Sequence, residues 1–266
     1  MKKEFSSTPD GASSRLFVHA LAKCFQMLEA LQKAGRPLGL NDLVEASGLN
    51  RSVVQRMAHT LKTLGYLRQH PDTRAYTLTS RMLSFSHTVL ALDRLREKAH
   101  PYLESLNQET GETVNLMKLE DDEIVYIGRF PSRFAVSVDL HVGSRLPAFC
   151  TAAGRAILSH LEPAVARAAL ERAERKPMTA YTVTGVPELM AVLAQARRAG
   201  YVINDQEAFI GDISIAAPLL DRQNKPVGAV NIAVPSPRWK LDDVQRTLVP
   251  QVVAAAKEIS ASLGDL

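Results

Sequence analysis

The sequence predicts an α+β fold of two domains, with a mainly antiparallel sheet flanked by helices in the second. In the first third of the chain, apolar residues recur at the three- and four-residue spacing of amphipathic helices. From residue 111 the pattern changes to alternating strands joined by short polar turns, which favours antiparallel pairing over a doubly wound sheet. A length of 266 residues also suggests about two domains.

Composition limits the classes of protein to consider. A hydrophobic content of 46% supports real cores, and a net charge of only +4 with a pI near 9.1 means that basicity is local. The two cysteines, Cys24 and Cys150, form no CxxC pair, so we expect no metal site and no cofactor. Cys24 lies in an apolar helix and is expected to be a buried thiol.

The N-terminal residues 1–13 are rich in Ser, Pro and Gly and are expected to form a disordered tail. Residues 1–11 lack the apolar centre of a signal peptide. No stretch approaches the ~20 apolar residues that cross a bilayer. We therefore expect a soluble, cytoplasmic protein with no membrane partner.

The first domain is predicted to span residues 14–79 and to begin with a helix from Ser14 that ends before Gly35. The apolar stripe of that helix is expected to be Leu21, Phe25, Leu28 and Leu31. A short helix then ends at Gly48, and a second begins after Asn50, a favourable N-cap residue, and runs to about Leu64. This spacing is typical of a helix-turn-helix.

The second helix of this pair has two chemically different faces. Its buried stripe is predicted to be Val54, Met57, Leu61 and Leu64. A helix in the major groove needs hydrogen-bond donors near its N-terminal end. The opposite face provides them, with Arg51, Ser52, Gln55, Arg56 and His59, and Lys62 further on.

Residues 66–68 and 75–78 read as two strands joined by the turn 70–74, which predicts a wing. Arg68 and Arg74 would contact phosphates or the minor groove. A basic helix alone is usually only a solvated surface. Here the helix-turn-helix spacing, the hairpin and five basic residues against one acid between 51 and 74 occur together, so the predicted partner is double-stranded DNA.

Residues 80–92 are predicted to form a linker helix whose apolar residues repeat every seven positions. This wide face could pack on its own chain or on the same helix of a second subunit. We favour dimerisation, because DNA-reading proteins commonly bind two half-sites. The second domain, 93–266, opens with a helix over 93–110, which Pro101 should kink or restart.

The rest of the second domain alternates between strands and helices. The expected strands are 112–119, 123–129, 134–140, 201–204, 213–220 and 227–234. The expected helices are 151–161, 163–174, 187–199 and a closing helix over 241–263.

Three stretches of this domain could hold a ligand. A loop leads into a helix capped by Thr151, where Ala152 and Ala153 would let a carboxylate approach free N–H groups. These small residues could equally serve close helix–sheet packing. Asn204, Asp205 and Ser214 could bind ligand hydroxyls, although a polar turn is the simpler explanation for the first two. Arg129, after the second strand, could pair with a carboxylate or be merely exposed.

No catalytic motif is present in the sequence. Gly143-Ser144-Arg145 lacks the second glycine of a nucleophile elbow, and there is no Walker loop and no GxGxxG. Cys150 with His141 or His160 is a conceivable nucleophile and base, but no local motif supports it. We therefore expect no catalytic residues and no enzyme activity.

From about Ser14 to the C-terminus, the chain resembles the IclR family of bacterial transcription regulators. The resemblance is carried by residues 40–66, Gly111-Glu-Thr-Val114, Val125-Tyr-Ile127, residues 143–158, Gly200-Tyr201 and Ile215-Ala-Ala-Pro218. It implies a winged helix-turn-helix joined to an effector-binding domain, usually in dimers or dimers of dimers. It also implies an effector pocket formed by the loop into the Thr151 helix, the Asn204 region and the Ser214 strand.

By position, Leu146, Ala152, Ala153, Asn204 and Ser214 match the family's ligand contacts. Many members have Asp where Asn204 stands and Cys where Ser214 stands, so the charge of the pocket differs here. Residues 142–151 look most like the subgroup that controls protocatechuate and hydroxybenzoate catabolism. That similarity implies an aromatic carboxylic acid effector, with its carboxylate at the helix N-terminus and its ring among Leu146, Phe149 and nearby apolar side chains.

The resemblance thus implies a ligand-responsive, DNA-binding transcriptional regulator of a catabolic operon. Effector binding would change the placement of the DNA-binding domains through the helix 80–92. The rival classes are a small-molecule enzyme that carries a DNA-binding domain, and a constitutive DNA-binding protein without an effector.

Overall fold

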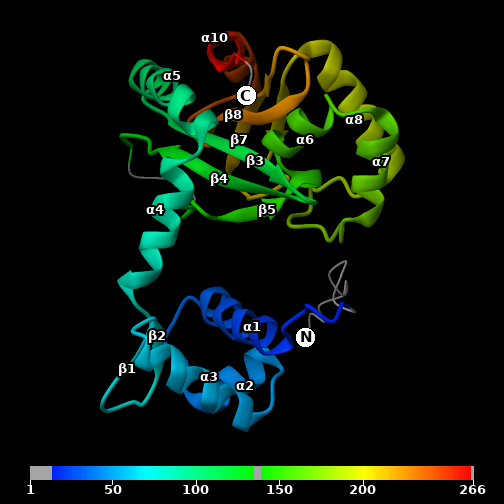
Figure 1. Cartoon of the computed structure of the whole chain (residues 1–266). Helices are drawn as coiled ribbons and strands as arrows, with labels where there is room; N and C mark the ends of the chain where they lie inside the picture. The colour runs from blue at the N-terminus through cyan, green and yellow to red at the C-terminus, as the bar shows by residue number, and fades with distance from the viewer. Residues whose placement is uncertain (1–13, 135–138, 265–266) are drawn as a thin grey trace. The chain divides into compact units, whose positions relative to one another are not determined.

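The computed structural model describes residues 14–134 and 139–264 (Figure 1). The predicted tail 1–13 and most of the predicted strand 134–140 lie outside the described residues. The chain divides into two compact units, Met1–Val89 and Leu90–Leu266. The division falls inside a helix, α4 (Leu83–Ala91), within the segment predicted as a linker.

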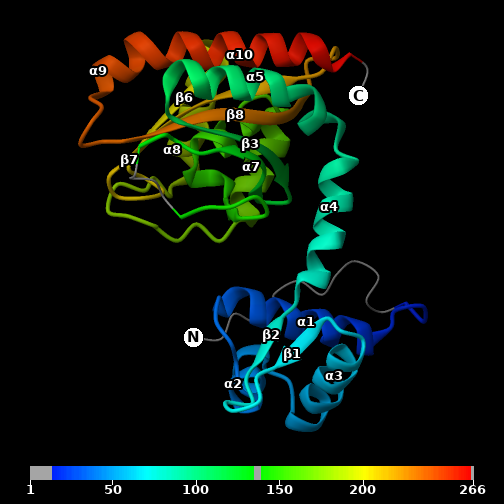
Figure 2. The ribbon, with the colours of Figure 1, turned by 90° about the vertical axis from the view of Figure 1, so that its left-hand side faces the viewer.

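Between residues 14 and 79, the first unit folds into three helices and a two-stranded antiparallel hairpin (Figure 2). Met27, Leu43, Val54 and Tyr76 are part of its core. Asn50 precedes α3 as predicted, although its side chain makes no capping bond. The elements are α1 (His19–Ala34), α2 (Leu40–Ser47), α3 (Arg51–Thr63), β1 (Leu67–Gln69) and β2 (Tyr76–Leu78).

Some predictions for this unit are wrong in detail. α1 begins at His19 rather than Ser14, and Leu21 and Phe25 are 59% and 62% exposed, whereas Met27 is fully buried. The buried face of α1 is decided by its contacts with α2, which the periodicity of one helix cannot reveal. Leu64 is likewise exposed, and Cys24 is only partly buried.

The predicted linker helix consists of a 3₁₀ turn, η1 (Ser80–Met82), followed by α4. Thr79 caps this turn by accepting a hydrogen bond from the Arg81 N–H. No residue of α4 is buried, and Leu83, Phe85 and Val89 are all more than half exposed. The apolar face predicted for dimerisation is therefore open to solvent in the single chain.

The second unit is built on one antiparallel sheet with the strand order β5-β4-β3-β8-β7-β6. The short strand β5 was not predicted; it pairs with β4, with Leu146 opposite Ile124. The strands are β3 (Thr113–Glu120), β4 (Glu123–Phe130), β5 (Arg145–Pro147), β6 (Val202–Asp205), β7 (Asp212–Leu220) and β8 (Pro226–Pro235).

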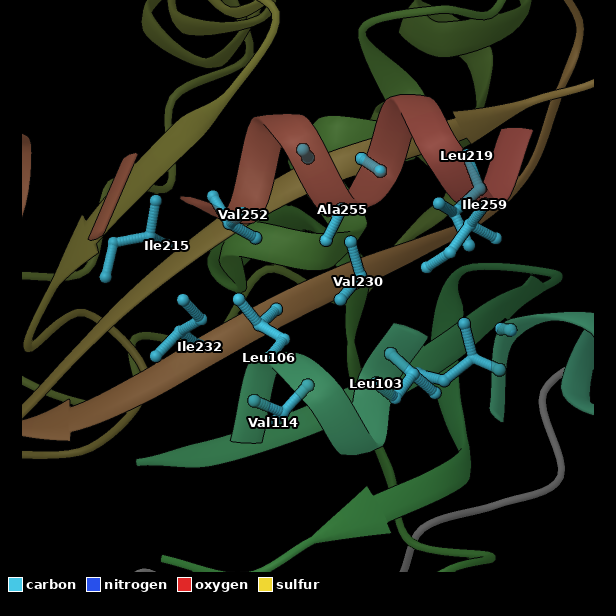
Figure 3. Close-up of a cluster of buried hydrophobic side chains, with 14 of the residues drawn as sticks. Leu103, Leu106, Val114, Ile215, Leu219, Val230, Ile232, Val252, Ala255 and Ile259 are labelled. Carbon is cyan, nitrogen blue, oxygen red and sulfur yellow. The ribbon is translucent and has the colours of Figure 1, made fainter. Parts of the chain in front are cut away.

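Helices cover both faces of this sheet. On one face, α5 (Arg94–Thr110) and α10 (Val249–Leu263) pack on an apolar cluster that includes Leu106, Val230 and Val252 (Figure 3). The other face carries α6 (Ala152–Leu158) and α8 (Val186–Ala199), with α7 (Pro163–Arg172) packed on α8. The first of these faces is covered by a large apolar cluster, whereas the cavity described below lies on the second.

One helix, the closing one, differs from the prediction. α5 runs through Pro101 as a single helix, so of the two predicted alternatives a restart does not occur. The closing helix is divided into α9 (Leu241–Asp243), a π-helical turn η3 (Val244–Leu248) and α10. The division precedes Pro250, which has no N–H for the preceding turn. No helix within residues 14–134 and 139–264 is long and apolar enough to cross a membrane.

Candidate nucleic-acid interface and ligand cavity

All eight side chains predicted to face DNA are exposed in the structure. A surface hollow between α3 and the hairpin gathers six of them, namely Ser52, Gln55, Arg56, His59, Lys62 and Arg74. Arg51 and Arg68 lie outside this hollow. Arg51 instead donates a hydrogen bond to the Asn41 side chain on α2. The first unit thus gathers six of the eight predicted side chains on one surface between α3 and the hairpin.

Gln69, which was not predicted, joins the helix to the wing. The Lys62 ammonium donates to Gln69 Oε1 at 3.2 Å, and Gln69 Nε2 donates to the Arg74 carbonyl at 3.0 Å. Arg74 has a left-handed backbone (φ 58°) at the end of the turn, which the His70 N–H closes by donating to the Ala75 carbonyl. These bonds fix the spacing between the two surfaces that would meet a duplex.

The second unit contains a partly open cavity of about 260 Å³ on the α6 side of the sheet. Strands β3, β4, β7 and β8 form its floor. The start of α6, with Leu140, Leu146 and the loop 208–211, closes it on the other side. The volume is near the lower end of the range of about 300–1,000 Å³ for ligand sites. The cavity therefore suits a small molecule.

The structure brings six of the nine predicted effector-binding residues to this cavity: Arg129, Leu146, Thr151, Ala152, Ala153 and Ser214. The other three are not in its wall. Phe149 is buried in the apolar core. Asn204 is 2% exposed; it donates to the Cys150 carbonyl at 2.9 Å and accepts from the Glu207 N–H at 3.2 Å. Asp205 accepts from the Gln206 side chain at 3.2 Å. These three residues therefore do not line the cavity, and their contact with a ligand stays a prediction.

A row of polar side chains crosses the cavity floor from strand to strand. Arg129 donates to Asn115 Oδ1 at 2.9 Å, and Asn115 Nδ2 donates to Asn231 Oδ1 at 2.8 Å. These residues are direct partners in the register of β4, β3 and β8. Sequence reasoning missed Asn115 and Asn231, although a lone asparagine in each apolar strand was a visible signal.

The start of α6 is held by side chains on both sides. Thr151 caps it as predicted, because its hydroxyl accepts from the Gly154 N–H at 3.2 Å. Arg155, which is 1% exposed, donates to the Phe149 carbonyl at 2.7 Å and forms a bidentate pair with Glu207 at 2.5 and 2.6 Å. Glu207 directly precedes the loop 208–211, so its ion pair with Arg155 holds one end of this loop and stabilises the cavity wall.

Two further cavity residues, Tyr126 and Asp212, were also missed. Burial, together with the charge of Asp212, raises the pKa of Tyr126, so that its phenol stays protonated. Burial raises the pKa of Asp212 from 3.8 to about 7, although the positive charge of Arg129 acts in the opposite direction. The cavity thus contains one cation and one carboxyl group that titrates near neutral pH.

This carboxyl group should make stability depend on pH. The raised pKa of Asp212 means that its protonated form favours the folded state, so its contribution is fully present below about pH 4 and is lost as pH rises through about 7. Asp212→Asn cannot ionise, so its advantage over the wild type should grow between these values, to roughly 2–4 kcal/mol. Denaturant unfolding from pH 4.5 to 8 measures this difference; a difference independent of pH would contradict it.

The Cys150 thiol is not activated as a nucleophile. Burial raises the pKa of the Cys150 thiol to about 12, so it is not a thiolate at neutral pH. In the part of the chain that the structure describes, no three His, Cys, Asp or Glu side chains gather in a way that could hold a metal ion.

A helix-turn-helix with an exposed basic face, followed by a domain that encloses a small cavity, defines the class of transcriptional regulators that bind DNA and sense small molecules. A model of the IclR helix-turn-helix domain matches residues 20–71, and a model of the bacterial transcriptional regulator IclR C-terminal domain matches residues 87–261. The chain therefore belongs to the IclR family and is a DNA-binding transcriptional regulator.

Individual relatives agree with this assignment. The chain is 32% identical to the Pca regulon regulatory protein of Pseudomonas putida, over 97% of this chain and 87% of that protein. It is 31% identical to the p-hydroxybenzoate hydroxylase transcriptional activator of Acinetobacter baylyi, over 81% and 80%. The curated relatives are thus transcriptional regulators.

Solved structures of the family share the fold over nearly the whole chain. The IclR transcriptional regulator of Alicyclobacillus acidocaldarius superposes with a TM-score of 0.80 at 25% identity, covering 93% of this chain and all of the other. An IclR homologue from Microbacterium hydrocarbonoxydans complexed with 4-hydroxybenzoate gives 0.77 at 25% identity, covering 92% and 98%.

Proposed function

We propose that the protein is a ligand-responsive regulator of a catabolic operon and that its effector is a small aromatic carboxylic acid bound in the cavity of the second unit. The observation that carries this proposal is Arg129, a guanidinium in the wall of a small cavity that also presents apolar side chains such as Leu146 and Phe209. Two relatives named for the Pca regulon and for p-hydroxybenzoate hydroxylase, and a family structure with 4-hydroxybenzoate, support the chemical class.

In this proposal Arg129 pairs with the effector carboxylate, because a guanidinium offers two parallel donors to it. The start of α6 is a weaker partner: this helix has seven residues, and the Thr151 hydroxyl already occupies the Gly154 N–H. Ala152 and Ala153 leave room for the ring, which would lie against Leu146. Phe209, which lines the cavity, would contact the ring of the effector in place of Phe149.

The test is a thermal-shift screen of the purified chain against hydroxybenzoates, protocatechuate, phthalates and aliphatic acids. An effector at a hundred times its Kd should stabilise the folded state by ~2.7 kcal/mol. Ala152→Leu, which fills the cavity, should abolish this shift and leave DNA binding intact, whereas Ala164→Leu on the exposed face of α7 should retain both. An unchanged shift in Ala152→Leu would place the effector elsewhere.

For DNA we propose that α3 is the recognition helix and the hairpin is the wing. Arg56→Ala should lower operator affinity by about 5- to 150-fold, since one good base contact contributes about 1–3 kcal/mol. Fluorescence anisotropy with a duplex selected from a random pool by the wild-type protein measures this loss, with Arg167→Ala on α7 as the control. Equal affinity of Arg56→Ala and wild type would remove Arg56 from the interface.

We further propose that the protein acts as a homodimer or a dimer of dimers and that α4 contributes to the subunit contact. The exposed apolar residues Leu83, Phe85 and Val89 support this. α4 is also the covalent connection between the two units, so we assign to it the transmission of effector binding to the DNA-binding unit. The ligand screen also tests two alternative functions: a small-molecule enzyme that carries a DNA-binding domain, and a constitutive DNA-binding protein without an effector.

A further inference from the structure

The cavity floor carries hydrogen-bonding groups that have no partner among the described residues. The Asn231 side chain is almost fully buried, and its Nδ2 group donates to no described residue, although its Oδ1 accepts from Asn115. The Tyr126 hydroxyl, the Ser214 hydroxyl and the Asp212 carboxyl also line the cavity, and none makes a side-chain hydrogen bond to a described residue. These groups face the cavity, where a polar ligand atom or ordered water would satisfy them.

Among these groups, Asp212 lies on a different strand from the cation of the cavity, whereas Tyr126 shares β4 with it. Arg129 is on β4 and Asp212 is on β7, with β3 and β8 between them in the sheet. Neighbouring strands are about 4.8 Å apart, so the three spacings from β4 to β7 place the backbones of Arg129 and Asp212 about 14 Å apart across the sheet. The long Arg129 side chain, which reaches Asn115 on the neighbouring strand, reduces this span to one that a single aromatic ring with a group at each end could bridge.

We propose that Asp212 selects effectors with a hydroxyl group on the ring, by accepting a hydrogen bond from that hydroxyl while Arg129 pairs with the effector carboxylate. This inference rests on the proposed function and deepens it. A phenolic hydroxyl donates one hydrogen bond and accepts others. Asp212 accepts the proton, and Tyr126 or the Asn231 amide donates to the phenol oxygen.

The charge of Asp212 also determines which acids are excluded. An effector with a second carboxylate in place of the hydroxyl would bring two negative charges together in a desolvated site, which is unfavourable. An effector with no group there would leave Asp212 and Asn231 without partners. The preferred class is therefore a monocarboxylic, ring-hydroxylated acid.

Isothermal titration of the full chain at pH 8 with 4-hydroxybenzoate, benzoate and terephthalate tests this selectivity. Wild type should bind 4-hydroxybenzoate about ten- to a hundred-fold more tightly than benzoate, as expected for one hydrogen bond to a charged group. Asp212→Ala should bring this ratio close to one. Asp212→Asn keeps the size of the side chain and should give an intermediate ratio with improved binding of terephthalate.

Asp242→Asn is the matched control, because Asp242 is an exposed acid on α9 outside the cavity wall. It should keep the wild-type ratio. A ratio in Asp212→Ala and Asp212→Asn equal to that of wild type would overturn the role of Asp212 and leave the effector class standing. No binding of any aromatic acid to wild type would overturn the proposed function and this inference together.

Discussion

Arg155→Leu is expected to lower the free energy of unfolding of the second unit by about 3–5 kcal/mol, the usual cost of removing one partner of a buried ion pair. The Glu207 side chain is only 13% exposed, and it would keep a carboxylate with no cation beside it. The Phe149 carbonyl would also lose the Nε donor. Trp239, the single tryptophan, lies in this unit, so its fluorescence during denaturant unfolding reports this loss.

A second, exposed pair provides the control for this effect. Arg167 and Glu171 on α7 are 3.9 Å apart and more than half exposed, so Arg167→Leu should change stability by no more than about 0.5 kcal/mol. The double variant Arg155→Leu, Glu207→Leu should recover part of the loss, because an apolar replacement of both partners leaves no isolated charge. Equal stability of Arg155→Leu and Arg167→Leu would show that the buried pair does not hold this unit together.

The effect should extend from stability to ligand response. Glu207 also accepts from the Val183 N–H at 2.9 Å, and its carbonyl accepts from the Thr182 hydroxyl at 2.6 Å. The ion pair therefore ties α6 and the segment around Thr182 to the loop that closes the cavity. Because these few bonds position the cavity wall, a substitution that destabilises α6 should also change the shape of the effector site.

The sequence predicted the order of elements well because each has its own local signal. The period of α3, the hairpin after it and the alternation along β3 and β4 are all local patterns. Burial depends on partners that local patterns do not identify: α1 turns Met27 inward and leaves Phe25 exposed. β5 has three residues, too few for any alternation to be recognised.

The same distinction holds for the candidate site. Arg129, Ala152 and Ser214 were found from loop positions and family resemblance, and all three line the cavity. Asn115 and Asp212 were not predicted as site residues. Both line the same cavity because of the register of β3, β8 and β7, which only the folded sheet defines. Asn204, which the family resemblance places at the ligand, donates a hydrogen bond to the Cys150 carbonyl.

Gly154→Ala is expected to be the second severe substitution, with a loss of roughly 3 kcal/mol or more in the second unit. A Cβ at residue 154 would lie 2.2 Å from the Ala148 carbonyl oxygen and 2.4 Å from its Cα. These are backbone atoms of the 3₁₀ turn η2 (Ala148–Cys150), so no side-chain rotation relieves the overlap. The turn and α6 would have to separate, and Trp239 fluorescence during denaturant unfolding measures the cost.

The separation would also move the cavity wall. The Ala148 turn leads through the Thr151 cap into Ala152 and Ala153, so Gly154→Ala should weaken the effector response in the molecules that still fold. Gly185→Ala is the matched control: its Cβ would meet only the flexible end of Glu188, and an N-cap alanine costs less than about 1 kcal/mol. If Gly154→Ala were as stable as Gly185→Ala and kept the full effector response, the close packing of η2 on α6 would not be what shapes the cavity.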